Sequence, residues 1–336
     1  IPVTLTLDGD GRISEADLRT ALANWNSQES SIISQIGDIN TWDTTNVTNM
    51  NTLFQNESQF NEDISTWNVS NVTTMVNMFY NCSKFSQDLS SWNVSKVTNM
   101  NNMFYNCGTF NTSINSWNVS NVKDMSWMFR NSGNNGYNQP LDNWNVSNVT
   151  NLSYMFGYTA FNQDIGGWDV ANCNNFTAMF QNITTFNQDL SSWAIKPTAN
   201  ISSMFQGASS FDQVLNGYYW LTNSGNQTNI FSGTSGSFGT LPDPLTITIS
   251  TTDLSNNDNS DYGVVNMVVT SSSSTTITET DISLTNGVIS EFTKNSGTNY
   301  TFKVSSNSLT DSTSLTILEN SVYNDSVAGP YNQASN

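Results

Sequence analysis

The sequence predicts a mainly β protein with short helices, in which a solenoid of repeated coils precedes a β-sandwich. Two observations carry this prediction. Tryptophan returns at a nearly constant spacing through the first two thirds of the chain, and alternating apolar and polar runs fill the last third, where tryptophan and methionine become rare. The expected domains are a cap at 1–33, a solenoid of about seven to eight 25-residue repeats at 34–238, and a sandwich at 239–336.

Composition and charge exclude several classes of function. The 336 residues include 9 lysines and arginines against 27 aspartates and glutamates, which gives a net charge of −18, and there is no histidine. Such a chain lacks the cations that neutralise nucleic-acid phosphates, and anionic lipid surfaces repel it. The missing histidine removes histidine-dependent catalytic triads and histidine metal sites. We therefore expect no nucleic-acid partner.

The start of the chain and its polar composition indicate where the protein acts relative to the cell. The chain begins Ile1-Pro2 without methionine, and it shows neither a signal peptide nor an apolar stretch long enough to cross a membrane. Its polar residues are mainly asparagine, serine and threonine, with few lysines. These features favour a mature or trimmed chain whose leader is gone, acting outside the cell without direct membrane insertion.

The first expected element is a loop followed by a helix, which together cover the open end of the solenoid at 12–34. The loop has the spacing of an EF-hand or dockerin-type calcium loop, in which oxygen ligands surround a glycine turn. Its expected ligands are Thr6, Asp8, Asp10, Arg12 through its carbonyl, Ser14 and Asp17. Threonine at the first position and aspartate at the twelfth depart from that pattern. The alternative is a turn that only starts the capping helix, with Ser14 as the N-cap and Asp17 at the third helical position. Calcium is the one cofactor that the sequence suggests.

The repeat unit is the next element, and aromatic residues mark it. Tryptophan returns at spacings of 25, 25, 25, 27, 24 and 25 residues. The tryptophans of this ladder are Trp42, Trp67, Trp92, Trp117, Trp144, Trp168 and Trp193. A Met-Phe pair and a further phenylalanine keep the same step, as at Met78-Phe79 and Phe85. A side chain that returns once per coil fills the same interior position in each coil, so these ladders predict the core.

Within one unit, a strand and a short helical segment are expected. Residues 64–69 match the strand signature of leucine-rich repeats, in which the first, fourth and sixth residues point inward. Apolar residues then recur three and four apart from Val72 to Phe79, which predicts a short α- or 3₁₀-helical segment. Strands of successive coils would lie about 4.8 Å apart in a parallel sheet. The predicted fold class of this part is a leucine-rich-repeat-like solenoid.

The outward positions of the predicted strand form the expected recognition surface. They carry small polar residues, among which asparagine recurs at turns where its side chain can bond the backbone. The candidate binding residues are Thr66, Asn68, Ser91, Asn93, Ser116, Asn118, Asn143, Asn145 and Asp169. An ordinary solvated face is the alternative. The irregular fifth copy, with the insert RNSGNNGYNQP at 130–140, is where a dedicated binding site would break the repeat pattern.

Two further ladders carry reactive groups. Cys82 and Cys107 occupy the same position in adjacent coils, which suits either a disulfide or two small buried residues. Aspartates recur just before an inward Ile or Leu, at Asp63, Asp88, Asp164 and Asp189. A glycosidase needs two carboxyl groups that face each other across a cleft, and a ladder along one edge does not supply them. We expect these aspartates to cap turns and the chain to have no catalytic residue.

The last third of the chain alternates apolar and polar residues after a linker rich in glycine and serine that starts near Ser232. The alternating runs begin at Leu245, Val264, Ile282, Thr301 and Ser314. They predict a β-sandwich of about 90 residues. The stretch 260–306 resembles bacterial Ig-like domains, and this resemblance implies a spacer or stalk.

The motifs of the repeats carry a family resemblance. FNQDLSSW at 186–193 and NVSKVTNMNNMF at 93–104 are the most specific of them. Over about residues 35–235 the units resemble the BspA-like 26-residue repeats of bacterial surface proteins, a branch of the leucine-rich repeats. The resemblance implies a surface-exposed or secreted protein linked to adhesion, and it brings no catalytic residues.

We therefore expect a non-enzymatic extracellular protein that is a structural or adhesive component of a cell surface, of a surface appendage or filament, or of a virion. Its expected partners are a protein or a glycan at a surface, or other copies of itself in an assembly. Two alternatives stay open: a receptor-type binding module for a glycan or host protein, and a carbohydrate-active enzyme. Sequons such as Asn68-Val69-Ser70 predict a glycoprotein if the source has a eukaryotic secretory pathway.

Overall fold

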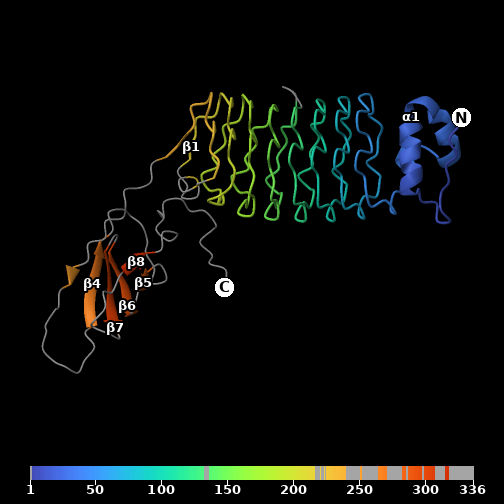
Figure 1. Ribbon diagram of the computed structural model, residues 1–336. Coiled ribbons are helices and arrows are strands. Elements are labelled where there is room, and N and C mark those ends of the chain that lie inside the picture. The colour runs from blue at the N-terminus through green and yellow to red at the C-terminus, as the bar shows by residue number, and fades with distance from the viewer. Residues whose placement is uncertain are drawn as a thin grey trace. The chain divides into compact units, whose positions relative to one another are not determined.

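Figure 1 shows the computed structural model of the protein, which describes residues 2–131, 136–215, 220, 223 and 225–239 and, further along, the strand residues 250–251, 264–270, 282–284, 287–296, 299–306 and 315–317. The chain divides into two compact units, Ile1–Gly239 and Thr240–Asn336. The first unit is a row of stacked coils headed by one helix. Within these described ranges, no helix is long and apolar enough to cross a membrane.

Helix α1 (Glu15–Ile36) covers the first coil at the blue end of the row in Figure 1. It begins after Ser14, whose Oγ accepts the backbone N–H of Asp17 at 3.0 Å. It ends at Gly37, where φ is 81°, a left-handed value that glycine adopts without strain. The start of the helix therefore has the Ser14 cap that the sequence offers as the alternative to a calcium loop.

An aromatic contact joins the helix to the coils. Trp25 of α1 packs edge-on against Trp42 of the first coil, with ring centroids 5.7 Å apart. The 3₁₀-helix η1 (Ile39–Thr41) leads from α1 into this coil. Because both tryptophans are buried, the helix closes the apolar end of the stack.

Each coil hydrogen-bonds the coils before and after it through a short extended segment. Met75 donates its N–H to the carbonyl of Asn99 at 3.0 Å, and Thr74 accepts the N–H of Met50 at 3.0 Å. Single parallel bridges repeat this contact along the row, at Asn49, Thr74, Asn99, Asp124, Asn151, Asn175 and Asn200. The coils therefore stack as the strands of a parallel ladder do, with one bridge per coil.

The strand predicted at 64–69 is wrong, because these residues form turns. The N–H of Trp67 donates to the carbonyl of Ile64 at 3.1 Å. The side chain of Asp63 accepts the backbone N–H of Ser65 at 2.9 Å. Such local bonds satisfy the backbone within the coil and compete with a strand ladder.

The short helix predicted from Val72 to Phe79 is also wrong. Asn77 and Asn81 adopt left-handed conformations, with φ of 54° and 61°. The N–H of Phe79 donates to Met103 in the next coil at 2.9 Å, whereas in an α-helix it would bond within its own coil. The apolar spacing of three and four residues therefore belongs to a chain of tight turns that alternate with bonds to the next coil.

The aromatic and methionine ladders form the core, as predicted. Trp92 is 3% exposed, and its indole N–H donates to the carbonyl of Ile64 in the preceding coil at 3.1 Å. Phe79 and Phe104 of adjacent coils stack with ring centroids 5.4 Å apart and planes 1° apart. Each coil thus contributes identical side chains to continuous stacks, and a single coil could not bury them alone.

The strands of the second unit are β3 (Ser250–Thr251), β4 (Val264–Thr270), β5 (Ile282–Leu284), β6 (Gly287–Ser296), β7 (Asn299–Ser306) and β8 (Leu315–Ile317). β3, β4, β7 and β6 form one antiparallel sheet in that order, and β5 pairs with β8. The alternating runs from Val264, Ile282, Thr301 and Ser314 are represented in these strands. Of the run from Leu245 only β3 is described, and the linker residues 240–244 lie outside the described residues.

The predicted fold class, a mainly β leucine-rich-repeat-like solenoid with an Ig-like sandwich, is therefore wrong. In the described part of the first unit the only named strands are β1 (Val214–Leu215) and β2 (Ser237–Phe238), which pair in parallel. Turns build the coils in place of the strand and helix of a leucine-rich repeat. Among the described strand residues of the second unit, no sandwich of two packed sheets is seen. Alternation predicts strands, but it does not determine which strands pair or which sheets pack.

Candidate functional site

The predicted recognition surface lies on exposed turns between buried tryptophans. All nine candidate residues are exposed. The hydroxyls of Ser91 and Ser116 donate to carbonyls of the preceding coil, both at 2.8 Å. The side chain of Asn93 accepts a backbone N–H two residues on, from Ser95 at 3.1 Å. These side chains already hold turns and neighbouring coils together, so their role in binding stays a prediction.

The predicted calcium loop is a turn tied together by its own carboxylates. Asp8 Oδ1 accepts the backbone N–H of Arg12 at 2.8 Å and that of Asp10 at 2.9 Å. The bond from Arg12 lowers the pKa of Asp8. The Arg12 guanidinium pairs with Asp10 at 2.8 Å. A cation of the chain therefore already neutralises one of the expected ligands.

The remaining expected ligands surround the helix cap. Asp17 Oδ2 accepts the Ser14 hydroxyl at 2.9 Å and the Thr6 hydroxyl at 3.4 Å. Across the described ranges, no three acidic, cysteine or histidine residues are arranged to hold a metal ion. The geometry fits the helix-capping alternative directly, and calcium binding stays a prediction.

The cysteines and aspartates of the two ladders form hydrogen bonds that stabilise the coils. Cys82 and Cys107 are free thiols that donate to carbonyls of preceding coils, at 2.8 and 2.7 Å. Burial raises the pKa of Cys82 to about 12 and that of Cys107 well above its ordinary value. The backbone N–H of Ser65 lowers the pKa of Asp63, which therefore accepts a turn bond as an ionised carboxylate. Neither ladder presents an activated nucleophile or a facing carboxyl pair.

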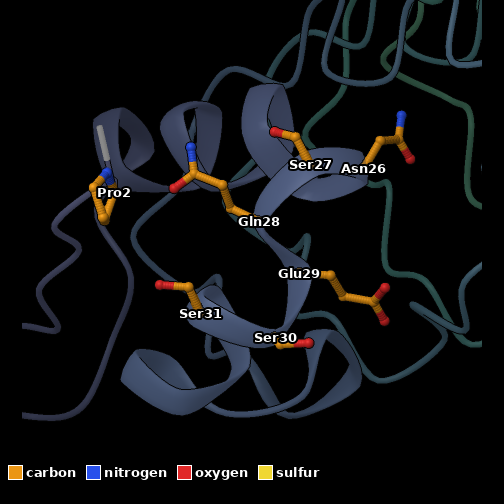
Figure 2. Close-up of a pocket in the computed structure, with 7 residues that line it drawn as sticks. All are labelled: Pro2, Asn26, Ser27, Gln28, Glu29, Ser30 and Ser31. Carbon is orange, nitrogen blue, oxygen red and sulfur yellow. The ribbon is translucent and has the colours of Figure 1, made fainter.

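A surface hollow lies where α1 bends at Gln28, whose φ of −135° is not helical. Figure 2 shows that the side chains around it point in different directions. The lining residues are Pro2, Asn26, Ser27, Gln28, Glu29, Ser30 and Ser31. Gln28 accepts the backbone N–H of Val3 at 2.9 Å, which ties the start of the chain to the bend. No set of reactive groups converges in this hollow.

A strip of aromatic side chains with one arginine runs along one edge of the second to fifth coils. We call it the aromatic strip; its residues are Tyr80, Tyr105, Trp127, Arg130, Tyr154 and Tyr158. All are half-buried except Tyr158, which is 40% exposed. Tyr80 and Tyr105 stack at 4.6 Å with planes 6° apart, and Trp127 stacks on Tyr154 at 4.2 Å. Tyr105 and Trp127, 6.1 Å apart, join the two pairs.

Arg130 is held by three rings of the strip. Its guanidinium carbon lies 4.2 Å from the ring centre of Trp127, 4.6 Å from that of Tyr154 and 5.1 Å from that of Tyr158. The Arg130 side chain lies beside Gly157, where a Cβ would be 3.5 Å from Arg130 Nε. The Nε atom is buried without a hydrogen-bond partner, and no ion pair among the described residues involves Arg130.

Three residues of the strip occupy backbone positions of positive φ that small or polar residues, asparagine most often, hold in the other coils. Each coil has two positions of positive φ, four residues apart. They are Thr52, Asn56, Asn77, Asn81, Asn102, Asn106, Trp127, Asn131, Tyr154, Tyr158, Ala178, Asn182, Ser203, Gly207, Asn229 and Gly233. Trp127, Tyr154 and Tyr158 have φ of 62°, 57° and 61°. A left-handed conformation costs a non-glycine residue roughly 1–2 kcal/mol, and bulky side chains are rare in it. Aromatic side chains therefore replace the locally favoured residue where the strip is exposed.

The irregular repeat pattern of the fifth copy lies near these residues but does not single them out. Arg130 begins the expected insert, while Ser132 to Asn135 lie outside the described residues. The signal that identifies the strip is the replacement of Asn77 and Asn102 by Trp127 and Tyr154 at the same position of later coils. This replacement is visible only when the repeats are aligned with the 27-residue fourth spacing taken into account.

Stacked coils that contact only their neighbours define the chain as a repeat protein. The model of a family described as "Mycoplasma protein of unknown function, DUF285" matches residues 20–136 and 132–239. The protein belongs to this family, since the match covers more than half of the chain. The expected relation to a repeat family is confirmed at this level, but the match does not extend to the BspA-like branch or to an Ig-like domain. The comparisons with curated proteins and with solved structures gave no match.

Proposed function

We propose that this protein is a non-enzymatic adhesive component of a cell surface and that the aromatic strip is the surface by which it binds. The strip carries the proposal. Trp127 and Tyr154 are half-buried, and they accept a strained backbone at a position that small or polar residues hold in the other coils. Bulky, partly exposed residues in a strained conformation where smaller residues fit the coil are typical of functional sites.

The extracellular location belongs to the same proposal. It is supported by the Asn/Ser/Thr-rich surface and by the resemblance of FNQDLSSW at 186–193 to BspA-like surface repeats. If the chain is a BspA-like surface protein, the coils would present the aromatic strip and the second unit would connect the coils to the cell surface. A receptor-type module differs from an adhesin only in what it reports after binding, and the strip suits both.

The absence of enzymatic activity is supported by the chemistry of the coils. The chain has no histidine. Asp88 and Asp189 accept the N–H groups of their own turns at 2.8 Å, as Asp63 does. Carboxylates held in separate turns along one edge do not form the facing pair of a glycosidase. A binding role therefore fits the side chains better than catalysis does.

Adhesion of beads coated with the full chain to an epithelial cell monolayer under flow tests the proposal. The variant Trp127→Asn with Tyr154→Asn removes the central rings and keeps residues that suit the backbone. We expect the variant to retain several-fold fewer beads than the wild type. The matched control is Ser91→Ala with Ser116→Ala, which alters the predicted polar face and leaves the strip intact.

The results of this assay distinguish binding by the aromatic strip from binding by the predicted polar face. Equal retention of the strip variant and the wild type would contradict the strip as the binding surface. Loss of retention in the serine control alone would move binding to the polar face. Wild-type beads that adhere no better than beads coated with albumin would contradict adhesion and favour a purely structural component.

A further inference from the structure

We propose that the aromatic strip binds an extended acidic segment of a partner protein, with the Arg130 guanidinium gripping a carboxylate of that segment. This inference rests on the proposed binding function and adds the chemistry of the partner.

Arg130 is a cation without an anionic partner among the described residues. No carboxylate of the described residues pairs with it, although the chain as a whole has 27 acidic residues and only 9 lysines and arginines. Three rings fix its planar group, and its Nε faces the backbone beside Gly157. The two Nη groups are the donors left for a ligand. A fixed guanidinium binds a carboxylate through two parallel N–H bonds, so its rigidity favours this class of ligand.

The rings of the strip present edges, and this favours a peptide over a sugar. Tyr80 and Tyr105 cover each other face to face, as do Trp127 and Tyr154. Each pair covers one face of each of its rings, and the ring edges carry hydroxyls and an indole N–H. No hydrogen bond to these groups is formed by the described residues of the first unit. Ring edges with polar tips suit the backbone and side chains of a peptide, and tryptophan, tyrosine and arginine dominate the energetic centres of protein interfaces.

The length of the strip sets the length of the bound segment. Tyr80, Tyr105, Trp127 and Tyr154 belong to four successive coils, joined by parallel bridges. Three steps at the spacing of a parallel ladder span about 14 Å, which an extended peptide covers with about four residues. A short acidic segment laid along the strip would therefore contact every ring and place one carboxylate at Arg130.

The net charge of −18 makes specific binding at Arg130 distinguishable from non-specific attraction by its dependence on salt. Repulsion between the acidic chain and an acidic partner is screened beyond about 8 Å at physiological salt, whereas the direct contact at Arg130 is screened much less. Binding by the strip should therefore persist as salt rises from low to physiological concentration. Non-specific attraction of an acidic peptide to scattered lysines would weaken over the same range.

Fluorescence anisotropy of labelled peptides with the full chain tests the inference. The probes are fluorescein-labelled hexaglutamate and hexaglutamine, with trigalacturonate as an acidic-sugar competitor. We expect hexaglutamate to bind at least tenfold more tightly than hexaglutamine and trigalacturonate to compete poorly. Arg130→Gln should weaken hexaglutamate binding at least tenfold, and Arg130→Lys should not restore it, because lysine lacks the planar fork.

Lys123→Gln is the matched control, because it removes the same charge from the same coil. Its Nζ bonds Asn148 Oδ1 at 3.1 Å and belongs to no part of the strip. Equal losses for Arg130→Gln and Lys123→Gln would overturn the role of Arg130. Displacement of labelled hexaglutamate by trigalacturonate at lower concentration than by unlabelled hexaglutamate would reassign the partner to an acidic glycan. The comparison of hexaglutamate with hexaglutamine needs only the wild type, so it does not depend on how the variants fold.

The bead assay keeps this inference separate from the proposed function. If beads adhere through Trp127 and Tyr154 but none of the three probes binds, the carboxylate partner is wrong and the adhesive strip stands. If neither adhesion nor probe binding depends on the strip, both are wrong. We expect Arg130→Gln to lower adhesion together with hexaglutamate affinity.

Discussion

Replacing Trp92 with alanine should destabilise the first unit by about 3–5 kcal/mol, the range for deleting a large buried aromatic side chain. The side chain is 3% exposed and lies 6.4 Å from the ring of Phe79, so its removal leaves a cavity among residues of rigid coils. Its indole N–H also satisfies the carbonyl of Ile64 at 3.1 Å. That carbonyl still accepts the backbone N–H of Trp67 at 3.1 Å, so the variant loses one hydrogen bond, worth about 0.5–1.5 kcal/mol, and leaves no unsatisfied acceptor.

Urea unfolding of the full chain, followed by tryptophan fluorescence, measures this loss. All ten tryptophans lie in Ile1–Gly239, so the signal reports on the coils and not on the second unit. Trp92→Phe separates the two contributions, because phenylalanine keeps most of the ring and loses the N–H. We expect its loss to be smaller, by at least about 1 kcal/mol, than that of Trp92→Ala.

Ser91→Ala is the matched control for this experiment. It changes the adjacent exposed residue and removes one bond to the preceding coil, at 2.8 Å from Ser65 O. A net hydrogen bond at an exposed site is worth about 0.5–1.5 kcal/mol, so the control should lose less than either Trp92 variant. A change under about 1 kcal/mol for Trp92→Ala would refute the assignment of the tryptophan ladder to the core.

Two further predictions follow from buried and turn-capping groups. The thiol of Cys107 should not react with Ellman's reagent at pH 8 until the protein unfolds, because burial raises its pKa well above the ordinary value; rapid reaction of the native protein would place this cysteine at the surface. The Ser65 N–H lowers the pKa of Asp63 below the ordinary value of 3.8, so the stability that this carboxylate contributes is present above that value and is lost as pH falls through the folded pKa. Melting temperatures between pH 5 and 2 should therefore fall less steeply for Asp63→Asn than for the wild type, and parallel curves would contradict this linkage.

The sequence predicted the core of the first unit because repetition constrains side chains more directly than backbone. Trp92 and its equivalents return once per coil, and a large apolar residue can recur so regularly only if each copy fills the same buried position. The backbone between these landmarks was not determined in this way. Apolar residues three and four apart suit a helix, but they suit equally the turns around Asn77 and Asn81, whose left-handed conformations rule a helix out. The recurrence of asparagine at these two positions was the overlooked signal.

The aromatic strip was harder to predict for a related reason. Trp127 is a tryptophan like the residues of the core ladder. Only its position within the coil distinguishes it from the buried Trp117 and Trp144. The contact of Arg130 with rings of the next coil depends on stacking, which no local pattern specifies. In the second unit, alternation located β4 correctly, whereas sheet packing depends on contacts between distant residues, which alternation leaves open.

Trp127→Asn should separate binding from stability, in contrast to Trp92→Ala. Asparagine tolerates the φ of 62° at this position and would relieve roughly 1–2 kcal/mol of backbone strain. The variant also loses the stack on Tyr154 at 4.2 Å and the contact with Arg130 at 4.2 Å, which are worth about 0.5–1.5 and 0.5–1 kcal/mol. The half-buried ring also loses buried apolar area, worth roughly 1–2 kcal/mol, so the unfolding free energy should fall by about 1–3 kcal/mol, less than for Trp92→Ala, while bead adhesion falls. A loss above about 3 kcal/mol would instead mark Trp127 as a core residue. Lost adhesion with a smaller loss of stability than Trp92→Ala is the result expected of a residue whose exposed edge binds a partner.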